Sequence, residues 1–271
     1  MANPPLYLYR SPMLNIHPTA IVSANAHLAD DVTVGPFAII DSGVTIGAGC
    51  KVGARSWITG KLTQIGINNK IGCGAIIGDD PQDTSFDPST PSGVIVGDNN
   101  RIGDYVTLHR STAENGNTVV GDGNFIMIGV HIGHDTVIGD NNNIANNVLL
   151  GGHIRIGNNV FLGAGAAFHQ FIYIGNFAIV QGNAALSRDI PPFCMAHGQN
   201  GLAGLNVIGL RRGGFNPAER SDIKRAYKLL FRSGGNLKEA LLQSENSEWT
   251  AGAQQLLDAA RNPSSKGLLS R

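Results

Sequence analysis

The sequence predicts an all-β parallel β-helix followed by a small α-helical domain. An aliphatic residue recurs at every sixth position over most of the chain, a period that fits neither an α-helix nor the alternation of a simple strand. Glycine makes up 36 of 271 residues, as expected of a chain that turns tightly and often. The repeat then stops, and a helix-start pattern follows near residue 216.

Each six-residue repeat is expected to form one short strand and one corner, with the aliphatic residue in the core and a glycine often after it. Three repeats close a triangular coil of about 18 residues. The 26 repeats predict nearly nine coils, a rod about 40 Å long at a strand spacing of ~4.8 Å. The aliphatic positions, one of which is occupied by a phenylalanine, are Ile16, Val22, Leu28, Val34, Ile40, Ile46, Val52, Ile58, Ile65, Ile71, Ile77, Val96, Ile102, Leu108, Val120, Ile126, Ile132, Ile138, Ile144, Leu150, Ile156, Leu162, Phe168, Ile174, Val180 and Leu186.

Two segments leave the period and return to it, near residues 79–94 and 113–119. They are expected to project from the rod as loops and to carry binding chemistry. The β-helix domain should therefore span residues 1–190. A connector and a helical domain should span residues 191–271.

The helical domain is expected to open at Asn216, the N-cap of a helix with Pro217 in its first turn and Glu219 closing a capping box. The pair Gly234-Gly235 should end this helix. Further short helices are expected over residues 237–242 and 251–260, and the tail from Asn262 is expected to be frayed.

Composition and charge exclude several classes of protein. The 20 basic and 20 acidic side chains cancel, which argues against nucleic acid as a partner. No apolar run approaches the ~18 residues of a membrane span. Pro4, Pro5 and Arg10 interrupt the segment where a signal peptide would be apolar. Three widely spaced cysteines make a disulfide framework improbable. We therefore expect a cytoplasmic protein.

Five of the eight histidines are separated by distances near one coil, so they are expected to gather on one edge of the rod. The group consists of His109, His131, His134, His153 and His169. A single histidine on such a rod is ordinarily a surface residue. Several on one edge favour a functional site.

Two kinds of site fit these histidines. Some β-helices, the gamma-class carbonic anhydrases among them, bind zinc through three histidines. Here His131 and His134 flank the inward-pointing Ile132 and do not obviously converge, so no metal is expected. The other interpretation is a general base, with His134 accepting a proton from a hydroxyl. Asp135 would then orient the ring, or would be only a corner residue.

Several stretches together resemble the UDP-N-acetylglucosamine O-acyltransferase family, from about Ile16 to Gly235. They are "IGVHIGHDTVIGDNNNIANNVLLGGHIRI", "GAAFHQFIYIG", "VTLHRST", "RDIPPF" and "GLNVIGLRRGGF". The resemblance implies a left-handed β-helix and a homotrimer with active sites between subunits. It implies transfer of an (R)-3-hydroxyacyl chain from acyl carrier protein to the 3-hydroxyl of UDP-N-acetylglucosamine (UDP-GlcNAc), the first step of lipid A biosynthesis. No cofactor is implied beyond the acyl-phosphopantetheine thioester.

The same resemblance implies roles for individual residues. His134 matches the general base, Asp135 its neighbour, and Gly152 the backbone N–H that stabilises the thioester oxyanion. Gly182 matches the position that sets acyl-chain length. The positions that match substrate contacts are Gln82, Asp83, His131, His153, His169 and Gln170, with Asn206 and Arg212 for the nucleotide.

The chain also departs from the family pattern. Ser85 stands where a lysine is usual, Ile208 where a glutamate is usual, and Gly213 where an arginine is frequent. These departures leave two alternatives open. One is the same transfer to a 3-amino sugar nucleotide, giving an amide. The other is a weakened scaffold that binds the same partners without turnover.

Basic residues gather around the first helix of the helical domain. They are Arg211, Arg212, Lys224, Arg225, Lys228 and Arg232. Because acyl carrier proteins are acidic, this cluster is interpreted either as their docking surface or as an ordinary solvated helix face.

Overall fold

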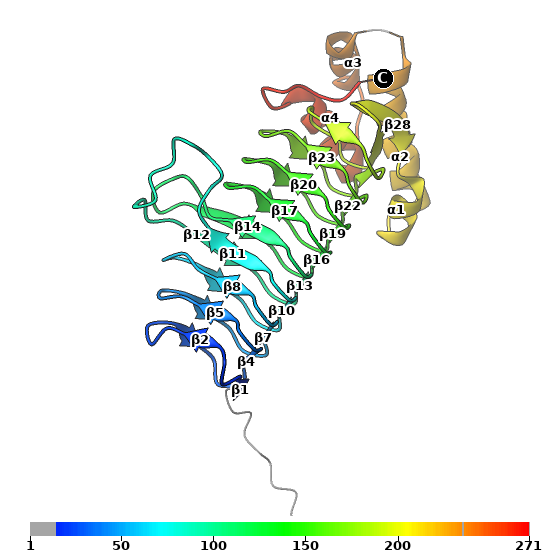
Figure 1. Ribbon diagram of the computed structural model, residues 1–271. Helices are drawn as coiled ribbons and strands as arrows, with labels where there is room; N and C mark the ends of the chain where they lie inside the picture. The colour runs from blue at the N-terminus through cyan, green and yellow to red at the C-terminus, as the bar shows by residue number, and fades with distance from the viewer. Residues whose placement is uncertain (1–14, 235, 271) are drawn as a thin grey trace, which may run out of the picture.

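The structure, a computed structural model, describes residues 15–234 and 236–270. The expectations for the N-terminal segment and for Gly235 lie outside these residues. Three parallel sheets form the sides of a rod, and the helices gather at its C-terminal end (Figure 1). No helix in the described ranges has the length and hydropathy needed to cross a membrane.

The strands of each sheet follow one another every third strand along the chain. The first sheet contains β1 (Asn15–Ile16), β4 (Thr33–Val34), β7 (Lys51–Val52), β10 (Lys70–Ile71), β13 (Arg101–Ile102), β16 (Phe125–Ile126), β19 (Asn143–Ile144), β22 (Phe161–Leu162), β25 (Ile179–Val180), β27 (Cys194–His197) and β28 (Gly201–Leu205). The second contains β2 (Ile21–Val22), β5 (Ile39–Ile40), β8 (Trp57–Ile58), β11 (Ile76–Asp79), β14 (Thr107–His109), β17 (His131–Ile132), β20 (Leu149–Leu150), β23 (Ala167–Phe168) and β26 (Ala185–Leu186). The third contains β3 (His27–Leu28), β6 (Thr45–Ile46), β9 (Gln64–Ile65), β12 (Gly93–Val96), β15 (Asn117–Val120), β18 (Val137–Ile138), β21 (Arg155–Ile156) and β24 (Tyr173–Ile174).

The predicted repeat is confirmed strand by strand, because every one of the 26 aliphatic positions lies in one of the strands β1–β26. From Val34 to Leu186 all of these side chains are buried. Ile16, Val22 and Leu28 are only partly buried, because no described coil lies beneath the first one. The hydrophobic core is therefore a continuous column inside the rod.

The rod is longer than the repeat predicts. In the described residues the first sheet has ten parallel strands, so the solenoid has about ten turns and not nearly nine. The extra strand is β27, which pairs parallel with β25, and β28 then pairs antiparallel with β27. This last turn was not predicted because its residues do not keep the six-residue spacing.

Both loops leave the rod at the corner between the second and third sheets. The first connects β11 to β12 through residues 80–92, and the second connects β14 to β15 through residues 110–116. Figure 1 shows them projecting from the same edge. This corner therefore differs from the other two, which turn tightly along the whole rod.

The helical region contains α1 (Val207–Arg212), α2 (Pro217–Arg232), α3 (Leu237–Ser244) and α4 (Ala251–Arg261). The capping box at the start of α2 is confirmed, because Asn216 accepts from the Glu219 N–H and the Glu219 side chain accepts from the Asn216 N–H. The short α1 was not predicted. Its N-cap is Asn206, which accepts from the Gly209 N–H.

The expectation of a frayed tail is wrong. The carboxylate of Asp189, only 1% exposed, accepts hydrogen bonds from the Ser264 N–H and hydroxyl. The backbone of Asp189 also pairs with Gly267 and Leu269. Since Leu269 is fully buried, the end of the chain is docked against the last coils.

Candidate active site

Residues 18 apart stack on successive coils at the corner between the second and third sheets. Asp135, His153 and Phe171 form one column, and each has a left-handed backbone with φ of 58°, 58° and 68°. His134 and Gly152 belong to the adjacent column, whose next residue is Gln170. The structure thus brings His134 and His153 together at this corner, although in different columns: His153 stacks above Asp135, and His134 lies below Gly152.

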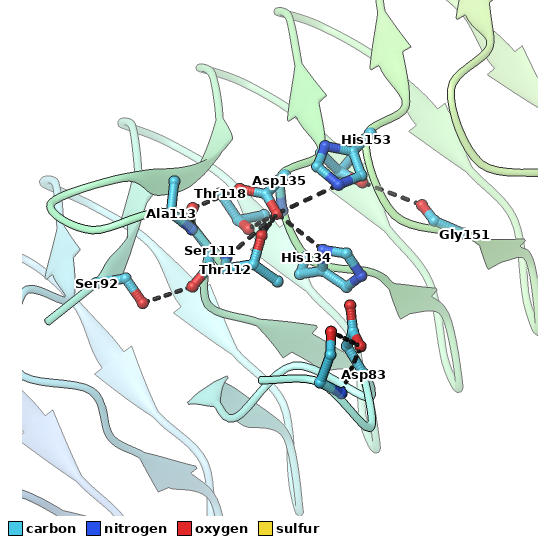
Figure 2. Close-up of polar contacts among 12 residues, drawn as sticks. Asp83, Ser92, Ser111, Thr112, Ala113, Thr118, His134, Asp135, Gly151 and His153 are labelled. Carbon is cyan, nitrogen blue, oxygen red and sulfur yellow. Dashed lines mark hydrogen bonds and ion pairs between the residues drawn. The ribbon is translucent and has the colours of Figure 1, made fainter. Parts of the chain in front are cut away.

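His134 and Asp135 form the centre of this corner (Figure 2). His134 Nδ1 lies 2.8 Å from Asp135 Oδ2. Because a carboxylate only accepts, Nδ1 carries the hydrogen and Nε2 is the basic nitrogen. Both side chains are 13% exposed. The arrangement fixes one tautomer of the imidazole and leaves Nε2 available for a proton from a substrate.

Asp135 is itself held by the second loop. Its carboxylate accepts from the Ser111 hydroxyl, and from the Thr112 hydroxyl at 2.6 Å and N–H at 3.2 Å. Burial alone would raise the pKa of Asp135, but the hydrogen bonds from Ser111, Thr112 and His134 outweigh it and lower this pKa to about 2. Asp135 is therefore both a corner residue and the partner that orients His134.

This shifted pKa predicts a loss of stability in acid. The folded-state pKa lies below the ordinary 3.8, so the stabilisation is complete above pH 4 and is lost as the pH falls through 2. The shift is worth about 2 kcal/mol. Between pH 5 and pH 2, the free energy of urea unfolding should fall by about 2 kcal/mol more in the wild type than in Asp135→Asn, whose side chain cannot titrate. Equal losses in the two proteins would contradict the assignment.

Gly152 approaches the imidazole so closely that any other residue would displace the ring. A Cβ at this position would lie 2.7 Å from His134 Cε1 and Nε2. Gly152 is buried, and its N–H has no acceptor among the residues that the structure describes. This donor is therefore free to bind an oxygen atom beside His134.

Two further side chains border the imidazole. The ring of His153 packs edge-on against His134 with centroids 5.1 Å apart, and its Nε2 lies 3.7 Å from Asp135 Oδ2. Asp83 extends from the first loop toward the side of His134 that faces away from Asp135 (Figure 2). Hydrogen bonds from the Ser85 N–H and hydroxyl lower the pKa of Asp83 and fix its carboxylate. Gln82, beside it, is exposed.

Arg110 holds the first loop in place, a role that the sequence did not reveal. Its buried guanidinium donates to Asp80, to the Thr90 and Pro88 carbonyl oxygens, and to the Ser92 hydroxyl. Because one side chain satisfies groups along the whole loop, Arg110 positions the segment that carries Gln82 and Asp83.

We expect Arg110→Met to destabilise the protein by about 2–3 kcal/mol, since it removes several charge-assisted hydrogen bonds. The loop should also become sensitive to proteolysis, and any ligand bound through Asp83 should bind more weakly. Guanidinium unfolding and limited proteolysis test this. The matched control is Arg101→Met, because exposed Arg101 contacts only the Phe125 ring among the side-chain contacts of the described residues. Equal stability in the two variants would show that Arg110 does not hold the loop.

His131 lies on the adjacent face of the second sheet. Its Nδ1 is 2.9 Å from the Thr107 hydroxyl, and its ring packs against that of buried His109. Burial lowers the pKa of His131, and the neighbouring His109 lowers it further. A groove of about 530 Å³ runs from His131 past Leu149 and Ala167 to Gln199, with exposed His169 on its side.

Three predicted residues lie away from this corner within the chain. Gly182 is at the corner between the first and second sheets, after β25. Arg212 is exposed at the end of α1. Asn206 is buried, and its side chain accepts from the Gly209 N–H and donates to the Phe177 carbonyl oxygen. Asn206 therefore caps α1, whereas its contact with a nucleotide stays a prediction.

His134, Asp135 and His153 are also near enough to one another to be considered as metal ligands. Two ligand atoms of a tetrahedral zinc ion are about 3.3 Å apart. The Nδ1 of His134 and the Oδ2 of Asp135 are 2.8 Å apart, which is a hydrogen-bond distance. The geometry fits an oriented base better than a zinc site.

Comparison with known proteins shows which family the chain resembles. Residues 189–269 match the family described as UDP N-acetylglucosamine O-acyltransferase, domain 2, and residues 25–60 and 117–152 match bacterial transferase hexapeptide repeats. A protein of Thermodesulfovibrio yellowstonii named acyl-[acyl-carrier-protein]–UDP-N-acetylglucosamine O-acyltransferase is 44% identical over 84% of this chain and 89% of its own. A Saccharophagus degradans protein of the same name is 40% identical over 95% of this chain and 100% of its own.

A solved structure extends the agreement to three dimensions. The UDP-N-acetylglucosamine acyltransferase from Campylobacter jejuni superposes with a TM-score of 0.89 at 34% identity, covering 95% of this chain and 100% of that one. The predicted left-handed parallel β-helix with a C-terminal helical region is thereby confirmed. The chain belongs to the UDP-N-acetylglucosamine O-acyltransferase family.

Proposed function

We propose that this protein transfers an (R)-3-hydroxyacyl chain from acyl carrier protein to the 3-hydroxyl of UDP-GlcNAc, the first step of lipid A biosynthesis. One observation carries the proposal. The imidazole of His134, fixed by Asp135 with Nε2 free, lies against Gly152, whose N–H donates to no described residue. A base and an oxyanion donor side by side are the two groups that acyl transfer needs.

The reaction follows from these groups. His134 Nε2 takes the proton of the sugar 3-hydroxyl as its oxygen attacks the thioester carbonyl. The carbonyl oxygen becomes an oxyanion, which the Gly152 N–H stabilises. The intermediate then collapses, the C–S bond breaks, and the imidazolium returns its proton to the leaving thiolate. Asp135 stabilises the imidazolium without itself becoming protonated.

The groove on the second sheet supports binding of an acyl chain. His131, Leu149, Ala167 and Ala185 are consecutive partners along this sheet, so they form one outward-facing row. Leu149 is 49% exposed, and the two alanines leave room above the sheet. The row leads from the catalytic corner toward Gln199, which pairs with Ala185. We assign the acyl chain to this groove, with Gly182 as the proposed limit on its length.

A basic surface supports docking of the carrier protein. A cavity of about 540 Å³ lies between β28, α1 and α2. Its charged lining residues are all cationic: Arg211, Arg220, Lys224, Lys228 and Arg232. Acidic partners are attracted to such a surface. We assign it to acyl carrier protein, which supplies the thioester, so that no metal or other cofactor is required.

A trimer is proposed because the sites that the family motif matches are spread over distant surfaces of one chain. Gly182 and Arg212 lie away from His134, and a neighbouring subunit would supply them. The outer face of the second sheet exposes Ile21 by 65% and Ile39 by 37%, an apolar surface suited to self-association. Sedimentation equilibrium should give three times the mass of the chain, and a monomer would contradict the shared site.

The remaining assignments are substrate contacts. Gln82 and Asp83 would bind the sugar from the first loop, and His131, His153, His169 and Gln170 would border the sugar and the thioester. Asn206 and Arg212 would bind the nucleotide from the neighbouring subunit. A guanidinium suits a diphosphate because it presents several donors in one plane.

A 3-amino sugar nucleotide is the second candidate acceptor. The observation that favours it is the anionic Asp83, whose nearest loop partner is the neutral Ser85 and not a lysine. A carboxylate without a cation beside it is available to pair with the ammonium group of such an acceptor.

The test offers UDP-GlcNAc and its 3-amino analogue side by side with 3-hydroxyacyl carrier proteins of several lengths. Turnover of UDP-GlcNAc supports the leading proposal. Turnover of the 3-amino analogue alone would contradict the leading proposal and support amide formation instead. Binding of both without turnover would contradict an enzymatic role and leave a scaffold.

A further inference from the structure

The C-terminal tail is built into the rod beside the catalytic corner. Asp189 accepts from the Ser264 N–H and hydroxyl and from the Tyr173 N–H, and all these bonds go to one buried carboxylate. The Asp189 N–H donates to the Gly267 carbonyl oxygen, and the Leu269 N–H donates to the Asp189 carbonyl oxygen. The backbone on both sides of Lys266 is therefore fixed.

This anchoring places the side chain of Lys266 next to the catalytic residues. The ammonium group of Lys266 lies 5.8 Å from the centre of the Phe171 ring. Phe171 stacks on His153 with centroids 4.5 Å apart and planes 11° apart. His153 in turn packs against His134. One aromatic ring thus separates the tail lysine from the histidines of the site.

The ammonium group of Lys266 has N–H donors that no described residue accepts from. Among the described residues its ammonium group forms no ion pair and no hydrogen bond, and a cation–π contact at this distance is worth about 0.5–1 kcal/mol when partly exposed. The side chain is only half-buried. Its long flexible stem lets the three N–H donors turn toward a ligand without moving the backbone.

The charge of Lys266 indicates which kind of ligand it can bind. Asp83 and Asp135, which border His134, are acidic and cannot bind an anion, and the guanidinium of Arg110 is already bound to Asp80 and to carbonyl oxygens. Under the proposed function, on which this inference rests, both substrates carry phosphate. A phosphate at the open edge of the His153–Phe171 stack needs a cation. We propose that Lys266 binds a phosphate group of a substrate there.

Two phosphates could be the partner: the diphosphate of the sugar nucleotide or the phosphodiester of the acyl-carrier arm. The test measures KM for UDP-GlcNAc at saturating acyl carrier protein, and KM for the acyl carrier protein at saturating UDP-GlcNAc. Both values are measured in Lys266→Met, Lys266→Arg and Lys51→Met. Lys51 is an exposed lysine on β7, in a coil far from the corner. Lys51→Met is the matched control, because it removes one positive charge elsewhere on the rod. Ser264→Ala loosens the tail without removing the lysine.

Lys266→Met is expected to raise KM for one substrate about tenfold, with kcat within twofold of the wild type. Lys266→Arg should restore most of the affinity, and Lys51→Met should behave as the wild type. A higher KM for UDP-GlcNAc identifies the diphosphate, and a higher KM for the carrier identifies its phosphodiester. Unchanged KM values, or a lower melting temperature with no rescue by arginine, would overturn the proposal.

Calorimetry separates this inference from the proposed function. UDP-GlcNAc and free phosphopantetheine are titrated into wild type and Lys266→Met. If the wild type shows no turnover, the proposed function fails, yet a tenfold weaker affinity of the variant for one ligand would still support the lysine contact. Equal affinities for both ligands would overturn it, whether or not the wild type turns over.

Discussion

His134→Ala is expected to lower the rate of acyl transfer by about a thousandfold or more, with little change in stability. In the proposed mechanism this imidazole is the base; it lies against Gly152, and its Nδ1 is already bound to Asp135. General base catalysis is commonly worth about 10²–10⁴ in rate. The measurement is the single-turnover rate with saturating 3-hydroxyacyl carrier protein and UDP-GlcNAc.

The control for this variant is His27→Ala. His27 is exposed on β3, in the first coil, so its removal should leave the rate unchanged. Circular dichroism should give the same spectrum for both variants and the wild type. A His134→Ala protein that keeps more than a tenth of the wild-type rate would rule out His134 as the base.

Asp135→Asn should cost about 10²–10³ in rate although it changes few atoms. Ser111, Thr112 and His134 all donate to this carboxylate. An asparagine side chain has one oxygen to accept and an NH₂ group that donates, so at least one of these donors would face another donor. The imidazole would lose its fixed tautomer, and the developing imidazolium would lose its counter-charge.

The matched control is Asp140→Asn. Asp140 lies on the same coil, accepts from the Asp122 N–H, and is followed on the next coils by Asn158 and Asn176 in the same role. An amide therefore fits that position, and the rate should not change. If Asp135→Asn also kept its rate, Asp135 would be a corner residue and not an orienting one.

The rod could be predicted from sequence because every repeat has the same six-residue pattern. Each aliphatic residue points inward at a spacing that only a coil satisfies, so 26 independent positions agree. The last turn could not be predicted, since β27 pairs in register without keeping that spacing. The docked tail was missed for a related reason. The anchor is one carboxylate, Asp189, and a single long-range set of hydrogen bonds leaves no pattern along the chain.

The location of the site could be predicted from sequence, but most of the residues that hold it in place could not. Spacing near one coil brought the histidines to one edge, and family resemblance gave them roles. Strict spacing of 18 residues would also have placed His153 above Asp135 and Gly152 above His134, the pairs that the structure contains. Ser111, Thr112 and Arg110 carried no such signal, because they act from segments where the repeat is interrupted.

The most direct test of the catalytic account is the ratio of thiol released to sugar ester formed in a single turnover. Wild-type protein would be mixed with a 3-hydroxyacyl carrier protein and UDP-GlcNAc, with free thiol and acylated nucleotide quantified in the same samples. We predict one thiol for each 3-O-acyl UDP-GlcNAc, because the base acts on a bound sugar hydroxyl while the oxyanion donor acts on the thioester carbonyl that this hydroxyl attacks. Thiol release without ester, or no release while both substrates bind, would contradict acyl transfer at this corner.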